Sequence, residues 1–195
     1  ISSGLIDGNA AADTIRVGGG ATAATLAGGY GADSISIAGT VSAAIISGGN
    51  AADASSNLDA ADTITIAGAV LNSQISGNVG NDSILVTGSA AGSTIGGGQD
   101  SDYVSIGSLV SAGQILGGSD SDTILIGAAL QGGASVFGGS ADLTATDDAN
   151  RISVVGGISK GAVYGGGDVD TILVAAEIIS ASIHGADGND TLSIG

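Results

Sequence analysis

Short alternations of aliphatic and polar residues recur along the whole chain. In Asp33–Ile37, Ile35 and Ile37 are separated by a serine, and aliphatic residues lie two and four positions after eight further polar residues. A period of two is typical of a β-strand that buries one face. We call the polar residue before each alternation the marker; the markers are Asp13, Asp33, Asp62, Asp82, Asp102, Asp122, Asn150, Asp170 and Asp190. The pattern predicts one strand after each marker.

The markers recur at a nearly fixed interval, so the chain is a repeat array. The numbers of successive markers differ by 20, but by 29 between Asp33 and Asp62 and by 28 between Asp122 and Asn150. Two loop insertions, predicted near residues 54–61 and 142–149, account for the longer intervals and are expected to protrude from one edge. No change of composition interrupts the series, so we predict a single continuous array over residues 1–195. We expect this array to be a segment of a longer chain.

Each repeat also has aliphatic positions outside the alternation. One lies seven residues before the marker, as at Leu26 and Ile75, and another lies eight residues after it, as at Val41 and Val70. Glycines separate these positions, and no segment has the 3.6-residue period of a helix. We therefore predict an all-β fold: a parallel β-solenoid, or β-roll, of about nine 20-residue turns with two short strands per turn.

Composition and charge limit the partners that the chain can have. Gly occupies 37 positions, aromatic residues make up 2% of the chain, and Pro, Cys, Met and Trp are absent. Nineteen acidic residues against three basic ones give a net charge of −16, which repels nucleic acid and anionic lipid. No run reaches 18 apolar residues, so we expect no membrane insertion. Cations are the partners that this charge favours.

The residues that end at each marker form a glycine-rich motif. It reads GGYGAD at Gly28–Asp33, GGQDSD at Gly97–Asp102 and GADGND at Gly185–Asp190. With the strand that follows, as in GGYGADSISI, it resembles the repeat-in-toxin (RTX, hemolysin-type) nonapeptide GGxGxDxUx. The resemblance implies a β-roll that is exported, binds calcium at its turns and folds in external calcium.

The motif also makes chemical sense as a calcium site. Glycine turns direct carbonyl oxygens to one place, aspartate adds a carboxylate, and Ca²⁺ takes six to eight oxygen ligands. Aspartate and glycine are common in turns without any metal. A column of carboxylates about 4.8 Å apart, however, carries a repulsion of roughly 3–4 kcal/mol per neighbouring pair at an effective dielectric constant of 20. A cation within the column removes that cost, so we predict calcium.

The motif occupies only one half of each turn. The other half, as in IAGTVSAAII at Ile37–Ile46, has no aspartate, so calcium is expected along one edge only. At Asn150, we expect Asp147 and Asp148 to substitute for the missing carboxylate. The predicted calcium ligands are Asp13, Gly29, Gly31, Asp33, Asp62, Gly80, Asp82, Asp100, Asp102, Asp120, Asp122, Asp148, Asp168, Asp170, Gly188 and Asp190.

Nothing in the chain indicates catalysis. His184 is the only histidine and belongs to a variable column, no group is placed to activate a serine, and Tyr30, Tyr103 and Tyr164 are scattered. We therefore predict no enzyme. We expect an extracellular structural element of the bacterial cell surface: part of a surface layer (S-layer), a filament or an adhesin stalk.

Copies of the chain are expected to associate end to end or laterally. Three residues after the marker, Leu85, Leu125 and Leu173 alternate with serines on the predicted outer face, which suits a packing surface.

Two alternative functions remain open. One is the C-terminal calcium roll of a secreted enzyme, whose catalytic domain would lie elsewhere in the chain. The other is an ice-binding solenoid, because threonines recur one residue after the marker; Tyr103 and Arg151 interrupt that column.

Overall fold

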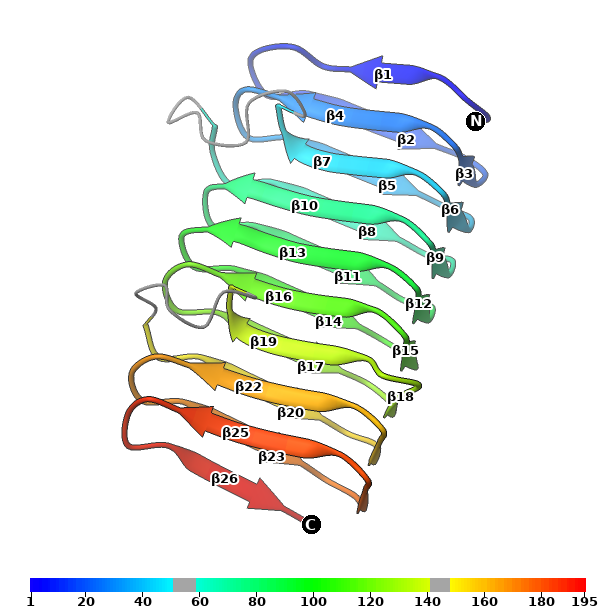
Figure 1. Ribbon diagram of the computed structural model, residues 1–195. Coiled ribbons are helices and arrows are strands. Elements are labelled where there is room, and N and C mark those ends of the chain that lie inside the picture. The colour runs from blue at the N-terminus through cyan, green and yellow to red at the C-terminus, as the bar shows by residue number, and fades with distance from the viewer. Residues whose placement is uncertain (51–58, 141–147) are drawn as a thin grey trace.

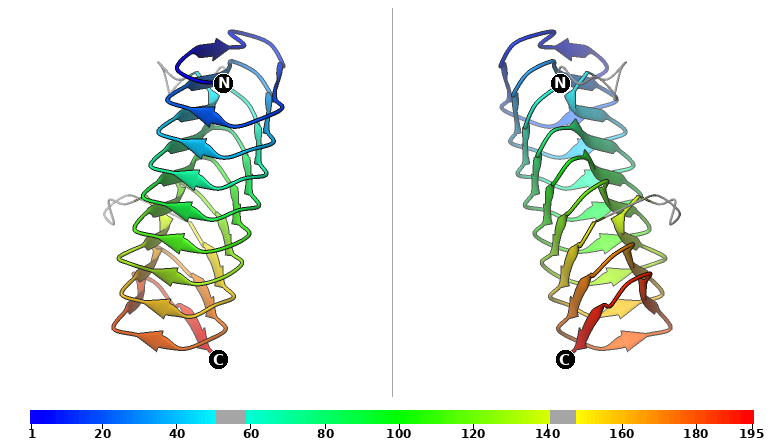
Figure 2. Two further views of the ribbon diagram at one scale, coloured as in Figure 1. Left: turned by 90° about the vertical axis from the view of Figure 1, so that its right-hand side faces the viewer. Right: turned by 90° about the vertical axis from the view of Figure 1, so that its left-hand side faces the viewer.

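The chain winds into a parallel β-solenoid of nine turns (Figure 1). The computed structural model describes residues 1–50, 59–140 and 148–195. The turns stack in one direction, and the two termini lie at opposite ends of the stack (Figure 2). No described residue belongs to a helix long and apolar enough to cross a membrane. The stacked parallel turns confirm the predicted fold class, an all-β parallel β-solenoid.

Three sheets form the walls of the solenoid. The marker sheet contains the strands that follow the markers: β2 (Thr14–Val17), β5 (Ser34–Ile37), β8 (Thr63–Ile66), β11 (Ser83–Val86), β14 (Tyr103–Ile106), β17 (Thr123–Ile126), β20 (Arg151–Val154), β23 (Thr171–Val174) and β26 (Thr191–Ile194). The short sheet contains two-residue strands: β3 (Ala21–Thr22), β6 (Val41–Ser42), β9 (Val70–Leu71), β12 (Ala90–Ala91), β15 (Val110–Ser111), β18 (Leu130–Gln131), β21 (Ile158–Ser159) and β24 (Ile178–Ile179).

The long sheet precedes the markers and closes each turn. Its strands are β1 (Leu5–Asp7), β4 (Thr25–Gly29), β7 (Ile45–Gly49), β10 (Gln74–Val79), β13 (Thr94–Gln99), β16 (Gln114–Gly118), β19 (Ser135–Gly139), β22 (Ala162–Gly166) and β25 (Ser182–Ala186). Each strand of the three sheets pairs in parallel with the equivalent strand of the next turn.

The prediction of two strands per turn was wrong, because the short sheet adds a third. Its strands carry the aliphatic residue eight positions after the marker, such as Val70 and Val110, both with 0% of their surface exposed. In a solenoid a segment pairs with its own counterpart one turn away, so even two residues find ladder partners. A segment of two residues is too short to show an alternation of apolar and polar residues, so the sequence pattern does not predict it as a strand.

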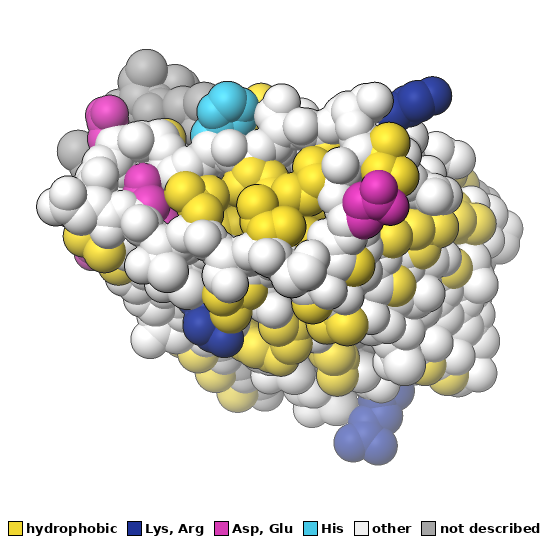
Figure 3. Space-filling model, turned by 90° about the horizontal axis from the view of Figure 1, so that it is seen from below, with side chains coloured by type: hydrophobic (Ala, Val, Ile, Leu, Met, Phe, Trp, Pro, Cys, Tyr) yellow, Lys and Arg dark blue, Asp and Glu magenta, His cyan; other side chains and the backbone are white. Residues whose placement is uncertain are grey.

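The core consists of aliphatic columns that run through the stack. In the fourth turn Ile75 comes from the long sheet, Ile84 and Val86 from the marker sheet, and Ala90 from the short sheet; all four are buried. Pairing is in column register, as in Ile64, Ile84 and Val104. Seen from below, the C-terminal end shows hydrophobic side chains gathered within the outline of the solenoid (Figure 3). The aliphatic core therefore extends to the last turn.

The first insertion is predicted near residues 54–61. Gly49 still pairs in register with Gly29, and Ala60 already lies against the backbone of Gly80 in the next turn. The additional residues therefore lie between Gly49 and Ala60. Of the predicted segment, residues 54–58 lie outside the described part of the chain.

The second insertion is divided between two corners. Ile115 pairs with Val136, one residue further along the chain than the regular spacing would place its partner. One additional residue thus lies at the turn with Gly132 and Gly133, which have φ values of 65° and 85°. The others follow Gly139, and most of the predicted segment 142–149 lies outside the described residues, which resume at Asp148.

The outer face of the marker sheet carries the threonine and leucine columns. Tyr103 lies between Ser83 and Thr123 in the ladder and is 40% exposed, so the hydroxyl column is interrupted as the sequence indicates. Leu85 and Leu125 lie on either side of Ser105, which is only 9% exposed. Leu85 is 40% exposed, whereas Leu125 is half-buried. Leu85 and Leu125 thus cover Ser105 between them.

Candidate functional site

The marker side chains form a buried ladder at the start of the marker sheet. The Oδ1 atom of Asp82 accepts the backbone N–H of Asp62 at 2.7 Å, and the Oδ1 atom of Asp102 accepts that of Asp82 at 2.7 Å. The same bond joins every pair of successive markers from Asp13 to Asp190, at 2.6–3.0 Å. We call these nine residues the marker ladder.

The ladder lies inside the solenoid wall. Asp62, Asp82 and Asp102 are 2%, 3% and 4% exposed, respectively. Each Oδ1 atom satisfies a backbone N–H of the preceding turn that would otherwise be buried without a partner. The aspartates therefore have a structural role in holding turns together, in addition to any role as ligands.

The second carboxylate oxygen of the ladder is different. The Oδ2 atoms of Asp13, Asp33, Asp62, Asp82 and Asp102 are buried and have no hydrogen-bond partner. A buried carboxylate oxygen without a partner is costly, because its hydration is lost and nothing replaces it. Several successive turns therefore each present an oxygen that a proton or a cation would satisfy.

The glycine under each marker side chain, five residues before the marker except at the two insertions, explains where this oxygen points. A methyl group on Gly77 would overlap the Oδ2 atom of Asp82 and meet the carbonyl oxygen of Gly97 in the next turn. The glycine is thus required because the carboxylate lies over its Cα atom. The same geometry directs a carboxylate oxygen and a carbonyl oxygen from two successive turns to one place.

Burial raises the pKa values of the ladder carboxyls. It raises the pKa of Asp62 and of Asp102 to about 7 and the pKa of Asp82 to about 9. Backbone hydrogen bonds act in the opposite direction, and neighbouring carboxylates add to the increase. The charged ladder is therefore unfavourable at neutral pH unless a cation compensates the charge.

The other predicted ligands lie in the turn that leads to each marker. Two positions of this turn have positive φ: Gly29, four residues before a marker, has φ 114°, and Gly31, two residues before it, has φ 111°. The second position is also occupied by Gly80, Gly188, Asp100, Asp120 and Asp168, with φ values of 117°, 118°, 70°, 69° and 58°. Aspartate tolerates this left-handed conformation better than most residues. Either glycine or aspartate thus occupies this position because the backbone there has a positive φ.

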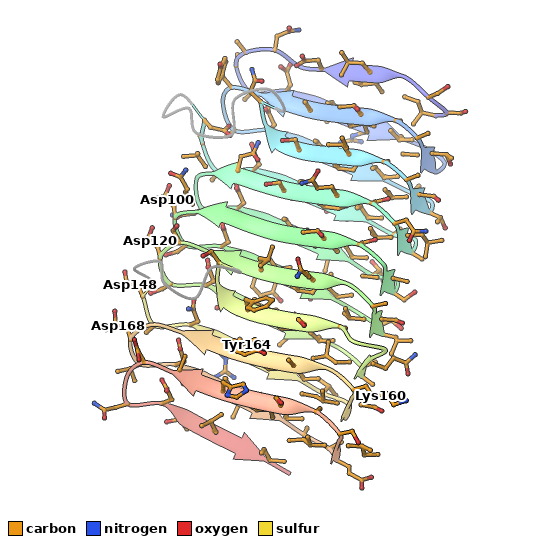
Figure 4. The ribbon with its side chains drawn as sticks, viewed as in Figure 1. Asp100, Asp120, Asp148, Lys160, Tyr164 and Asp168 are labelled. Carbon is orange, nitrogen blue, oxygen red and sulfur yellow. The ribbon has the colours of Figure 1, made fainter. Side chains whose placement is uncertain are left out.

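Asp100, Asp120, Asp148 and Asp168 form a second, exposed column. Their side chains follow one another along the edge of the solenoid (Figure 4). This column lies on the same edge as the buried ladder but is exposed to solvent, and the charges of Asp100 and Asp120 contribute to the raised pKa of Asp102. Their assignment as calcium ligands stays a prediction. Asp147, the other substitute for a carboxylate at Asn150, lies outside the described residues.

The donor set fits calcium in kind. Every candidate donor is an oxygen: a carboxylate Oδ2, a glycine carbonyl, or a carboxylate of the exposed column. Among the described residues, no three acidic or histidine side chains converge on one point. A calcium ion here would therefore depend on backbone carbonyls as well as on the Oδ2 atom of a marker.

The opposite corner shows how a similar ladder is satisfied without a cation. Ser73 and Ser93 follow the short strands, and their Oγ atoms accept the backbone N–H groups of Ala44 and Ser73, both at 3.1 Å. Each hydroxyl donates its own proton to a carbonyl, that of Leu71 at 2.7 Å or that of Ala91 at 3.0 Å. A hydroxyl brings a proton and an ionised carboxylate does not. That cations bind at one edge only stays a prediction.

Sequence reasoning missed one partly buried carboxyl. Asp59 lies three residues before marker Asp62, and its Oδ1 atom accepts the N–H of Ala60 at 3.1 Å. Burial raises its pKa to about 6, and the charge of Asp33 contributes. Its position within the turn that precedes a marker was the signal that could have found it.

The aromatic residues are less scattered than predicted. Phe137 and Tyr164 stack with centroids 4.9 Å apart, and Tyr164 and His184 stack at 5.0 Å, with interplanar angles of 7° and 6°. All three lie in one column of the long sheet. Their faces cover one another, so no free face remains between them for a sugar or a base. The additional residue near Gly133 hid this register in the sequence.

No family model, no curated protein and no solved structure matches this chain. The RTX resemblance therefore rests on the motif itself.

Proposed function

We propose that this chain is an extracellular structural element, a solenoid of a surface layer, filament or adhesin stalk, that is made rigid by calcium along the marker ladder. The observation that carries the proposal is the row of buried Oδ2 atoms without hydrogen-bond partners; those of Asp13, Asp33, Asp62 and Asp82 are directed to the same place as a glycine carbonyl of the next turn. Divalent cations neutralise such a row and link the turns that it crosses.

The arrangement of the remaining groups supports a mechanical role. Acidic side chains repeat along one edge and His184 takes part in a ring stack, whereas a catalytic centre brings unlike groups together in a cleft. A stack of turns with a continuous core makes a stiff spacer. The calcium roll of a secreted enzyme would have the same site, so calcium binding alone does not distinguish the two.

Circular dichroism with and without calcium tests the proposal. At pH 7.5 in excess chelator, most of the strand signal should be absent, because the ladder carboxylates are then uncompensated. Millimolar Ca²⁺ should restore it, since a site at a hundred times its Kd stabilises the fold by about 2.7 kcal/mol. Full strand content in chelator, together with no heat of calcium binding, would refute the proposal.

A matched pair of variants links the effect to the ladder. Asp102→Asn preserves the shape of a buried ladder side chain and should reduce the number of bound ions. Glu177→Gln removes one charge from an exposed residue between β23 and β24, away from the ladder, and should leave the number of bound ions unchanged. An equal loss in both variants would indicate non-specific attraction of cations to a chain of charge −16.

A further inference from the structure

One rung of the marker ladder is an asparagine. The Oδ1 atom of Asn150 accepts the N–H of Asp122 at 2.8 Å, and the N–H of Asn150 donates to Asp170 at 2.8 Å. Asn150 is 3% exposed. It therefore continues the ladder with the same backbone contacts as the aspartates.

The remaining amide atom of Asn150 is placed where the other rungs have Oδ2. The Nδ2 atom lies over Gly138, as the Oδ2 atom of Asp82 lies over Gly77. It donates to the carbonyl oxygen of Gly165 in the next turn, at 3.4 Å. The orientation of the amide is fixed, because only Oδ1 can accept the N–H of Asp122.

The chemistry of this rung is thus the inverse of the others. At an aspartate rung, two oxygens from successive turns are directed to one place, which is repulsive without a cation. At Asn150 an N–H group faces the carbonyl, so the two turns attract each other directly. An amide nitrogen that donates its hydrogens toward the carbonyl is not a calcium ligand.

We propose that the Asn150 rung takes no calcium and joins its turns without it, in place of the expectation that Asp147 and Asp148 substitute for a carboxylate there. This inference rests on the proposed function, since it describes where the calcium column is interrupted. The column is divided into one block from Asp13 to Asp122 and a second block from Asp170 onward. The turns that contain β17, β20 and β23 then form the part of the solenoid that holds together when calcium is withdrawn.

Asn150→Asp tests the first half of the proposal by isothermal titration calorimetry. The variant should bind one more Ca²⁺ ion per chain than the wild type, and the matched variant Asp82→Asn should bind one fewer. If the wild type binds no calcium, the proposed function fails. If the wild type binds calcium and Asn150→Asp gives the same stoichiometry, the proposed function stands and this inference is overturned.

Hydrogen exchange of the wild-type chain in chelator at pH 7.5 tests the second half. The amide of Asp122, which donates to Asn150, should exchange about tenfold more slowly than the amide of Asp82, which donates to the carboxylate of Asp102. In Asn150→Asp the difference should vanish. Equal exchange of the two amides in the wild type would contradict the inference.

Discussion

Replacement of Asp82 separates the two roles of a ladder carboxyl. Its Oδ1 atom accepts the N–H of Asp62 at 2.7 Å, and both residues are buried. Asp82→Ala leaves that N–H without its acceptor, at a cost of about 1–3 kcal/mol. Asp82→Asn retains the acceptor and offers Nδ2 to the carbonyl of Gly97, as Asn150 does to that of Gly165. The alanine variant should therefore be less stable than the asparagine variant by about 1–3 kcal/mol.

Urea unfolding at pH 5 in chelator measures this difference. Burial raises the pKa of Asp82 to about 9, so at pH 5 the wild-type side chain is protonated and resembles asparagine. Wild type and Asp82→Asn should then unfold at similar urea concentrations, and Asp82→Ala at a lower one with an unchanged m value. At pH 8 without calcium, Asp82→Asn should become more stable than the wild type. If alanine and asparagine variants agree within about 0.5 kcal/mol at pH 5, the ladder does not stabilise the fold as argued.

Three further predictions concern the same fold. Without calcium the chain should be more stable at pH 5 than at pH 9, because the pKa values of Asp62, Asp82 and Asp102 are raised in the folded state. The stability that these protonated carboxyls contribute is complete below their ordinary pKa and is lost as the pH rises toward about 9. Thermal unfolding at several pH values measures this loss. Gly97→Ala should prevent closure of its turn, because the methyl group overlaps the carboxylate of Asp102; loss of strand signal even in calcium is expected, and a native spectrum would be inconsistent with the close contact. Tyr164→Ala should lower stability by about 1 kcal/mol beyond the loss of buried area, through loss of two stacked contacts, with no change in calcium stoichiometry by calorimetry.

The repeat and its strands could be predicted because residues that stack in register in a solenoid recur at a fixed spacing in the sequence. Ile64, Ile84 and Val104 stack in the structure for the same reason that they recur at a spacing of 20: each covers its counterpart one turn away. Val70 and Ala90 show the limit of this reasoning, because a two-residue strand has no alternation to detect.

The chemistry of the turns could be predicted only in part. Aspartate and glycine in the motif GGxGxD indicate oxygen donors, but they do not show which carboxylate is buried. In the structure Asp102 belongs to the buried ladder, whereas Asp100, two residues earlier, is exposed at a position that needs a positive φ of 70°. The hydrogen bonds of the ladder join residues a full turn apart, so no local pattern reveals them.

Anomalous scattering from crystals grown in calcium tests the central claim most directly. We predict peaks between successive turns along the marker edge, each within about 2.3–2.6 Å of a ladder Oδ2 atom and a glycine carbonyl oxygen. No peak should lie between Asn150 and Gly165, and none at the corner of Ser73 and Ser93. An ordered solenoid without peaks along the ladder, or with peaks at the serine corner, would contradict the account.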